Sequence, residues 1–235
     1  MNRQAGAASL SRQAYFEIRR SILNGSYPLG SPISRRKIAQ SLGMSVVPVS
    51  DALQKLEAEG LVESWPRVGT RVRIPTLQDV RGHYVVREGL ETQSARLFSQ
   101  KASPDEREEI LRLAAQLDEL YQQCERGEMT PEENFHLHER HFRFHMRIAE
   151  CTGHVALCAA IERNQVLTFN WLYDAAAKRT VFPVNHHGKL AEALVQSEIE
   201  KADYAMRQHV VYGAEDLLRA LEPVLSPSLI QTATF

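Results

Sequence analysis

Ser34-Arg-Arg-Lys-Ile-Ala-Gln-Ser-Leu-Gly-Met-Ser-Val-Val-Pro-Val-Ser-Asp-Ala-Leu53 carries two short helical patterns separated by a glycine. Ser34 can cap a helix over residues 35–42, which would stop at Gly43. Ser45 can cap a second helix that runs to about Glu59. Two helices joined by so short a turn predict a helix-turn-helix, in which the second helix enters the major groove of DNA.

The sequence on either side of this motif completes a winged helix. Before it, Ala14, Ile18 and Ile22 mark one apolar face of a helix. After it, residues 61–64 and 70–74 alternate enough to form two strands, and the link between them would be the tip of a wing. The N-terminal third therefore predicts a compact module for contact with DNA.

Beyond residue 75 the sequence is helical almost throughout, with breaks at proline and glycine. The pattern predicts a mainly α fold: a winged helix-turn-helix domain over residues 10–75, an all-helical ligand-binding bundle over 76–223 and a flexible tail over 224–235. Within the bundle we expect helices near residues 77–101, 104–126, 131–151, 154–178, 184–197 and 199–222.

Charge divides the chain in the same way. Residues 1–75 contain 11 Lys and Arg against 5 Asp and Glu, a balance of +6, whereas the remainder has 17 against 24, a balance of −7. A basic first third favours a polyanion as its partner. No apolar run approaches the roughly 20 residues that span a bilayer, and the three cysteines match no close-set zinc pattern. We therefore expect a cytoplasmic location with no membrane partner.

Histidines are the most suggestive feature of the second part. His141 and His145 stand four residues apart in a predicted helix, so both imidazoles project from one face. His187 and His209 lie on two further predicted helices. Four converging imidazoles would suit a divalent transition metal, zinc first and nickel second. The alternative is a polar pocket without a metal, because nine histidines make chance pairs common.

Several fragments together resemble a known family. Ala14-Tyr-Phe-Glu-Ile-Arg-Arg-Ser-Ile-Leu-Asn-Gly25, Leu42 to Leu53, Leu56-Glu-Ala-Glu-Gly-Leu-Val62 and Val68-Gly-Thr-Arg-Val72 resemble the winged helix of GntR-type transcriptional regulators. The second half is similar to the FadR-type C-terminal ligand-binding bundle, with Val86-Arg-Glu-Gly-Leu-Glu91, Phe144-His145, Thr152-Gly153, His187 to Leu194 and Ala202 to His209 as its marks. The likeness covers roughly residues 12 to 222.

The resemblance implies a metal and an effector in one pocket. It places His187 and His209 with His145, and it places Arg87 as the arginine that binds a carboxylate effector; the other interpretation of Arg87 is a surface salt bridge with Glu91. His141 stands where the family has a metal-binding aspartate. Four neutral ligands would leave the charge of the ion uncompensated, so we expect a strong preference for an anionic effector.

The resemblance also departs from the family at the recognition helix. The usual Ser-Arg-Thr-Pro-Val-Arg-Glu-Ala-Leu reads Ser45-Val-Val-Pro-Val-Ser-Asp-Ala-Leu53 here, so Val46 and Ser50 replace two arginines. The expected contacts with double-stranded operator DNA are cations for phosphates, hydroxyls for hydrogen bonds and apolar groups for thymine methyls. They are Arg36, Ser45, Val46, Val47, Pro48, Ser50, Arg67, Thr70 and Arg71.

These features predict a regulator rather than an enzyme. The expected protein is a homodimeric transcriptional repressor whose operator affinity responds to a small organic acid bound at the metal. One alternative is a sensor for the metal itself. The other is a metal-dependent hydrolase, which would need a general base beside the histidines.

Overall fold

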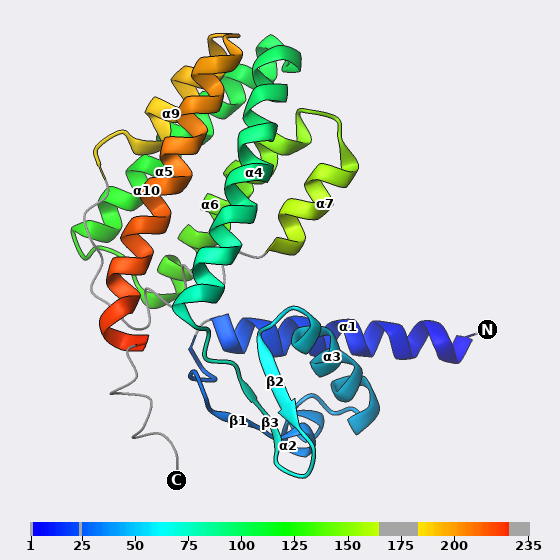
Figure 1. Ribbon diagram of the computed structural model, residues 1–235. Helices are drawn as coiled ribbons and strands as arrows, with labels where there is room; N and C mark the ends of the chain where they lie inside the picture. Colours follow the sequence, from blue (N-terminus) through cyan, green and yellow to red (C-terminus); the bar gives the residue numbers. More distant parts are fainter. Residues whose placement is uncertain (1, 24, 165–182, 226–235) are drawn as a thin grey trace. The chain divides into compact units, whose positions relative to one another are not determined.

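The computed structural model describes residues 2–23, 25–164 and 183–225 of the chain (Figure 1). It divides into two compact units, Met1–Pro75 and Thr76–Phe235. No helix in the described ranges is long and apolar enough to cross a membrane.

The first unit is a winged helix. It contains α1 (Asn2–Leu23), β1 (Pro32–Ile33), α2 (Arg35–Ser41), α3 (Val46–Ala58), β2 (Val62–Trp65) and β3 (Gly69–Val72). The strands form an antiparallel sheet in the order β1-β3-β2, with Val62 opposite Val72. The sequence did not predict β1, because two residues are too short to show alternation. Helix α1 also begins at Asn2, well before Ala14, the first residue of the predicted apolar face.

Glycine ends α2 as predicted, and the backbone shows why. Gly43 has a φ of 63°, which lets the amide of Met44 donate to the carbonyl of Ala39 at 3.0 Å. This pattern closes the last helical turn and is easiest for a residue without a Cβ atom. Ser45 occupies the cap position of α3, but its side chain makes no capping hydrogen bond. The turn geometry, rather than a serine cap, therefore starts α3.

The core of this unit lies between α1 and α3. Ile18, Ile22, Leu53 and Leu56 are at most 2% exposed, which confirms the predicted apolar face of α1. Burying each such side chain contributes roughly 1.5–3 kcal/mol to stability. This packing holds the exposed face of α3 in a defined orientation.

The second unit is a helical bundle. Its described helices are α4 (Leu77–Lys101), α5 (Pro104–Glu125), α6 (Pro131–Glu150), α7 (Val155–Asn164), α9 (His186–Val195) and α10 (Ile199–Leu225). Thr76, Ser103 and Thr130 each cap a helix reciprocally with an acidic residue three positions later. The predicted helix over 154–178 begins as α7, and its part beyond Asn164 lies outside the described residues. The predicted tail begins too early, because α10 continues to Leu225.

Within the bundle, α4 and α10 run side by side, and α5 packs against α6 and α9 (Figure 1). Phe98, Ile110, Leu194 and Met206 are at most 1% exposed and form part of the core. This arrangement directs side chains from five helices toward one interior region. The polar groups there make the candidate site.

Candidate functional site

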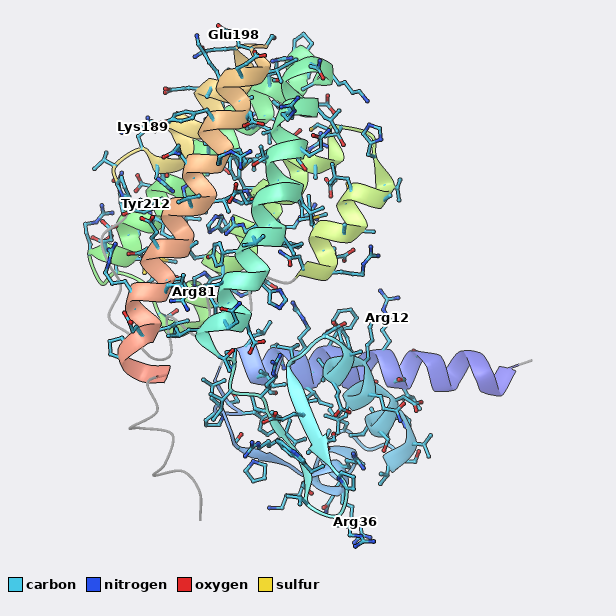
Figure 2. All side chains as sticks on the ribbon, viewed as in Figure 1. Arg12, Arg36, Arg81, Lys189, Glu198 and Tyr212 are labelled. Atoms are coloured by element: carbon cyan, nitrogen blue, oxygen red, sulfur yellow. The ribbon has the colours of Figure 1, made fainter. Side chains whose placement is uncertain are left out.

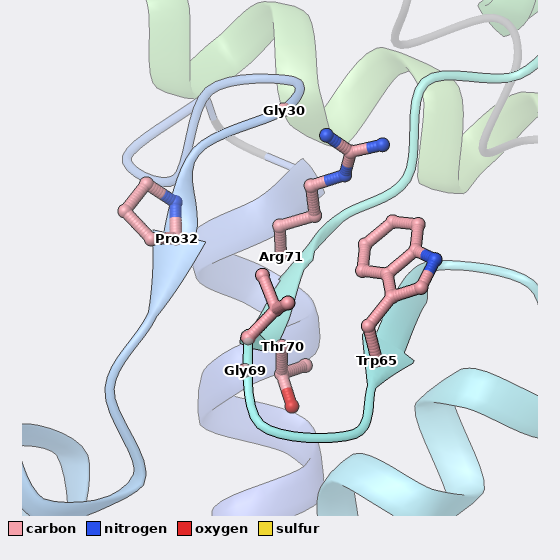
Figure 3. A pocket seen from close by; sticks show the side chains of 7 residues that line it. Gly30, Pro32, Trp65, Gly69, Thr70 and Arg71 are labelled. Carbon is pink, nitrogen blue, oxygen red and sulfur yellow. The ribbon is translucent and has the colours of Figure 1, made fainter. Parts of the chain in front are cut away.

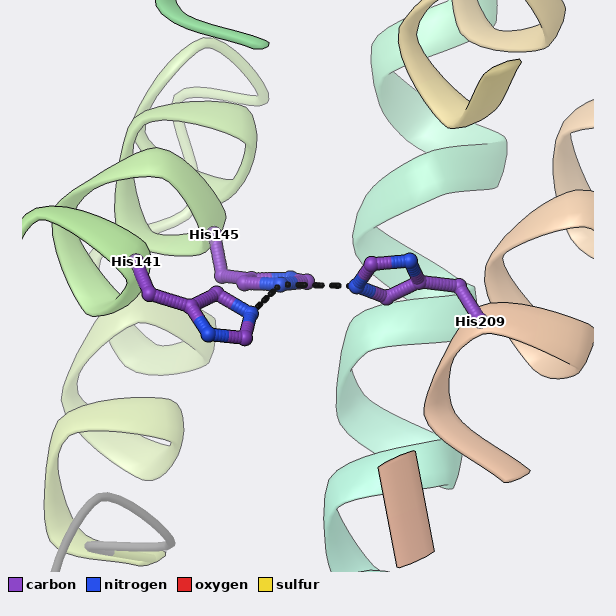
Figure 4. A group of neighbouring side chains, drawn as sticks. All are labelled: His141, His145 and His209. Atoms are coloured by element: carbon purple, nitrogen blue, oxygen red, sulfur yellow. Dashed lines mark hydrogen bonds between the residues drawn. The ribbon is translucent and has the colours of Figure 1, made fainter. Parts of the chain in front are cut away.

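Three imidazoles meet in the interior of the bundle. His141 and His145 are one turn apart on α6 and extend toward His209 on α10 (Figure 4). Nε2 of His145 lies 3.0 Å from Nε2 of His141 and 3.3 Å from Nε2 of His209. All three side chains are buried, at 3–6% exposure. A ligand atom of each histidine lies within 4.8 Å of those of the other two.

His187 on α9 lies beside this group and not within it. Its ring centre is 4.9 Å from that of His141 and 5.1 Å from that of His209. The structure therefore brings together all four rings that the sequence singled out, but only three of them present closely spaced ligand atoms among the described residues. His186, for which no role was predicted, stacks on His209 with ring centres 4.3 Å apart.

The donor set suits a metal ion. Nitrogen atoms bound tetrahedrally to one zinc ion at about 2.0–2.1 Å stand roughly 3.3–3.4 Å apart, and Nε2 of His145 lies at a similar distance from Nε2 of His141 and of His209, 3.0 and 3.3 Å. Burial is the main cause that lowers the pKa of each histidine, well below its ordinary value for His141 and His209. The imidazoles are therefore neutral at neutral pH, and only a neutral ring has a lone pair that can bind a metal.

Arg87 and Glu91 of α4 complete one side of the cluster. Nε of Arg87 donates to Oε1 of Glu91 at 2.8 Å, and Nη2 of Arg87 lies 3.2 Å from Nε2 of His145. The other carboxylate oxygen, Oε2, lies 2.8 Å from Nδ1 of His145. Both side chains are about 5% exposed. The pair with Glu91 therefore exists, but it is a buried part of the site and not the surface bridge considered from sequence.

A second carboxylate reaches the cluster from α5. Asp118 lies 2.7 Å from Nδ1 of His187, and it accepts hydrogen bonds from the backbone amides of His187 and Gly188 at 3.0 and 2.9 Å. These amides open α9, where Asn185 makes no side-chain cap. Asp118 thus caps one helix from another and orients a histidine. Nothing in the sequence marks it for this role.

Tyr121, one turn after Asp118 on α5, contacts the remaining side of the cluster. Its hydroxyl is 2.7 Å from Nδ1 of His141. Sequence reasoning also missed this residue. The spacing of Asp118 and Tyr121 put them on one face of a helix, but no pattern showed that this face meets histidines.

The two carboxylates are ionised at neutral pH. Burial opposes the charge of Glu91, but Arg87 and His145 outweigh it and lower its pKa to about 2. Burial likewise opposes the charge of Asp118, and hydrogen bonds from His187 and Gly188 lower its pKa. The expectation of an uncompensated metal charge therefore needs correction. Two anions contact the histidines from outside the set of ligand atoms.

In the winged unit, most of the predicted DNA contacts lie on the surface. Arg36 projects from α2 into solvent (Figure 2). Val46 and Val47, at the start of α3, are 41% and 68% exposed. Ser45, Arg67 and Arg71 are also exposed, and Ser50 is half-buried. This surface combines cations with small hydroxyl and apolar groups.

Pro48 and Thr70 are different, because both are buried. Pro48 packs into the core from the first turn of α3. Oγ1 of Thr70 accepts a hydrogen bond from Arg35 and pairs with the hydroxyl of Ser64, each at 3.0 Å. These two side chains support the fold, and their burial disfavours the DNA contacts predicted for them, which stay a prediction. Gln54, which the sequence analysis did not select, is exposed one turn after Ser50 on α3.

Side chains on the surface of the wing contact one another. The guanidinium of Arg71 lies 4.2 Å from the ring centre of Trp65, and its Nε donates to Glu63 at 2.7 Å. Beside this pair, a hollow of about 430 Å³ extends to Pro32 of β1 (Figure 3). Stacking and the ion pair hold Arg71 in place on the surface of the wing.

Known proteins share both units. The model of bacterial regulatory proteins of the gntR family matches residues 10–72, and that of the FCD domain matches residues 83–212. The transcriptional regulator YdhC of Bacillus subtilis (strain 168) is 25% identical over 215 residues, which cover 89% of this chain and 92% of that protein. The transcriptional repressor RspR of Escherichia coli (strain K12) is 23% identical over 205 residues, 86% of each chain.

The fold is also found in a solved structure. A GntR-type transcriptional regulator from Rhodococcus sp. RHA1 matches with a TM-score of 0.71 at 20% identity, covering 90% of this chain and 99% of that one. At this identity the likeness supports the fold alone. The two family models match in the expected order, and the FCD model covers more than half of the chain. The protein therefore belongs to the GntR family of regulatory proteins and carries an FCD domain in its second unit.

Proposed function

We propose that this GntR-family regulator is a repressor whose affinity for operator DNA is controlled by a small carboxylate bound at a divalent metal in the FCD domain. The observation that carries the proposal is the buried histidine cluster with Arg87 at its edge. A regulator needs no buried cations and imidazoles for its fold alone. Burying charged and titratable groups is costly even when they are paired, so a cluster of them inside a bundle supports a ligand site.

His141, His145 and His209 would hold the metal, with His187 adjacent to them. FCD domains commonly bind metals, and an all-imidazole set favours zinc, with nickel as the second choice. The ion would supply a positive charge that attracts and orients a carboxylate. Arg87 would add a planar fork of donors that matches both carboxylate oxygens.

The charges of the interior support one carboxylate as the effector group. Arg87 is positive, Glu91 and Asp118 are negative, and the histidines are neutral, which leaves one negative charge. Asp216, a buried carboxylate of α10, is left out of this sum because it pairs at 4.0 Å with Arg219. A divalent ion changes the balance to one positive charge. A single carboxylate then brings it to neutrality.

The winged unit would bind DNA through α3 and the wing. Its balance of +6 supports a polyanion partner, and one winged helix reads only a half-site. We therefore propose a homodimer on a palindromic operator. Sedimentation that showed a monomer with full operator affinity at micromolar concentration would contradict this part.

Control of DNA binding requires that the effector prefer one of two arrangements of the protein. For a repressor that its effector releases from DNA, the arrangement that the effector prefers has the lower operator affinity. The family relationship supports this direction of control through the repressor RspR.

The test is a titration of operator binding by the full chain, with zinc and a panel of small carboxylates added separately and together. The proposal predicts that zinc alone leaves operator binding in place and that a carboxylate weakens it only when zinc is present. Release by zinc alone would favour the metal-sensor alternative. No response to any combination would contradict metal-dependent effector control.

A hydrolytic enzyme is the weaker alternative. Glu91 and Asp118, the carboxylates at the cluster, both contact Nδ1 atoms and not the Nε2 side where a metal would lie. A general base needs to reach a water molecule on the metal side. The geometry therefore supports orientation of the histidines and not proton transfer.

A further inference from the structure

We propose that Glu91 is a positioning residue that holds the metal ligand His145 and the effector-binding Arg87 with the two oxygens of one carboxylate. This inference rests on the metal and effector site proposed above and goes beyond it. Glu91 would not touch the metal or the effector. Its role would be to orient both the metal ligand and the effector-binding arginine through one side chain.

The two carboxylate oxygens of Glu91 contact different partners. Oε1 accepts from Nε of Arg87 at 2.8 Å, while Oε2 lies 2.8 Å from Nδ1 of His145. The carboxylate is buried, so little water competes for either oxygen. Arg87 and Glu91 are also one helical turn apart on α4, which keeps their separation constant.

The contact with His145 selects one form of its ring. A carboxylate beside Nδ1 favours the tautomer that carries its proton there, which leaves the lone pair on Nε2. Nε2 is the atom that faces His141 and His209. A carboxylate in this position also makes the ring a stronger electron donor to a metal. Glu91 would thus prepare His145 for ligation before an ion arrives.

The contact with Arg87 orients the guanidinium. Because Nε is held by Oε1, the terminal nitrogens are left for other partners, and Nη2 lies 3.2 Å from Nε2 of His145 at the edge of the cluster. These terminal nitrogens are the ones that can bind a carboxylate in parallel. Asp118 contacts His187 and Tyr121 contacts His141, whereas Glu91 contacts a histidine and Arg87 together. Glu91 is therefore the described carboxylate that joins metal ligand and effector arginine.

The test compares zinc affinity, measured by competition with a chelator, in the full-length chain and its variants. Glu91→Gln keeps the size of the side chain but removes its charge, and it should weaken zinc about 10–100-fold. Glu91→Asp keeps the charge and should recover part of this loss. Glu88→Gln is the matched control, because Glu88 lies on the same helix but pairs with Arg207 at the surface; it should leave zinc affinity unchanged.

Arg87→Ala separates positioning from simple charge pairing. It removes a positive charge near the ion and leaves Glu91 beside His145, so zinc affinity should not fall. If Arg87→Ala and Glu91→Gln weakened zinc equally, Glu91 would act only through Arg87 and the proposal would be wrong. Circular dichroism confirms that each variant is folded before it is compared.

Nitrogen-15 NMR of the histidine rings in metal-free protein supplies a readout that a purely structural role would not move. His145 should carry its proton on Nδ1 in the wild type and lose this preference in Glu91→Gln. A wild-type ring protonated on Nε2 would overturn the proposal. If the wild type bound no zinc, the metal centre itself would be wrong. If the wild type and Glu91→Gln bound zinc equally tightly, only the role of Glu91 would be wrong.

Discussion

The surface of the winged unit and the interior of the bundle use the same residue types under opposite physical conditions. Arg71 pairs with Glu63 on the wing, where both are partly exposed, whereas Arg87 pairs with Glu91 at about 5% exposure. Water screens the first pair and contributes little to the second. An Arg–Glu pair is therefore a local surface feature in one region and a buried pair in the other, where loss of one partner should lower stability.

The two regions also assemble their functional groups differently. The candidate DNA-binding side chains come from α2, α3 and the wing, within about forty consecutive residues. The candidate metal centre draws on α4, α5, α6, α9 and α10, and its partners are separated by up to 122 positions, from Arg87 to His209. Substitutions in the DNA-binding surface should thus change DNA binding alone. Substitutions in the metal centre should change both ligand binding and the stability of the bundle.

The largest expected effect is the loss of the metal. His145→Ala and His209→Ala should each abolish stoichiometric zinc and the rise in melting temperature that zinc gives to the wild type, since a ligand present at 1,000 times its Kd stabilises by about 4 kcal/mol. Elemental analysis and thermal unfolding, on protein without a histidine tag, measure both. His136→Ala, at an exposed histidine of the same helix, is the control. Unchanged zinc in the first two variants would contradict the centre.

The next largest effect should be on stability. It compares substitution of the buried Arg87 with substitution of the exposed Arg71. Arg87→Ala leaves the buried charge of Glu91 without its arginine and should lower the free energy of unfolding by about 3–5 kcal/mol. Arg71→Ala breaks an exposed pair and should lower it by at most about 1 kcal/mol. Urea unfolding followed by circular dichroism measures the difference. Similar losses in both variants would remove the contrast between the two regions.

The stability of the metal-free bundle should decrease with acid in two ranges. Burial lowers the histidine pKa values, so the unfolded chain binds protons more readily, and stability should fall as the pH drops below about 6.5. The pKa of Glu91 is lowered to about 2, so its contribution is present above about 4.5 and should be lost as the pH falls toward 2. Urea midpoints from pH 8 to pH 3 show both. Constant midpoints between pH 7 and pH 5 would contradict the first range.

Zinc should suppress the first of these losses. Ligated imidazoles do not take up protons until the metal leaves, so the midpoint should stay level to a lower pH in zinc-loaded protein. The comparison of loaded and metal-free samples therefore also tests whether the buried histidines are the groups that titrate.

The smallest expected effect is on the DNA surface. Arg36→Ala and Arg67→Ala should each weaken binding to duplex DNA and reduce the slope of log affinity against log salt by about 0.9, the value for one phosphate contact. Neither should change the melting temperature measurably, because both side chains are exposed. Arg112→Ala, an exposed arginine of the bundle, should alter neither quantity and serves as the control. A large loss of stability in Arg36→Ala would show that this surface is not independent of the fold.

Much of the fold could be predicted because its signals are local. Gly43 ends α2 through its own backbone, and Thr76, Ser103 and Thr130 cap helices within four residues of themselves. Family resemblance placed the four histidines in one region, which the bundle bears out. These features depend on neighbours in sequence or on patterns shared by related chains, so they are visible before the structure.

Other features arise only from packing. The strand β1 exists because β3 pairs with it, and Pro48 and Thr70 are buried because other elements cover them. Asp118 and Tyr121 face the histidines only after α5 packs beside α6 and α9. Burial and contacts between distant segments are properties of the whole fold. For this reason the sequence identified the histidines of the candidate centre, while the tertiary structure decided which charged groups surround them.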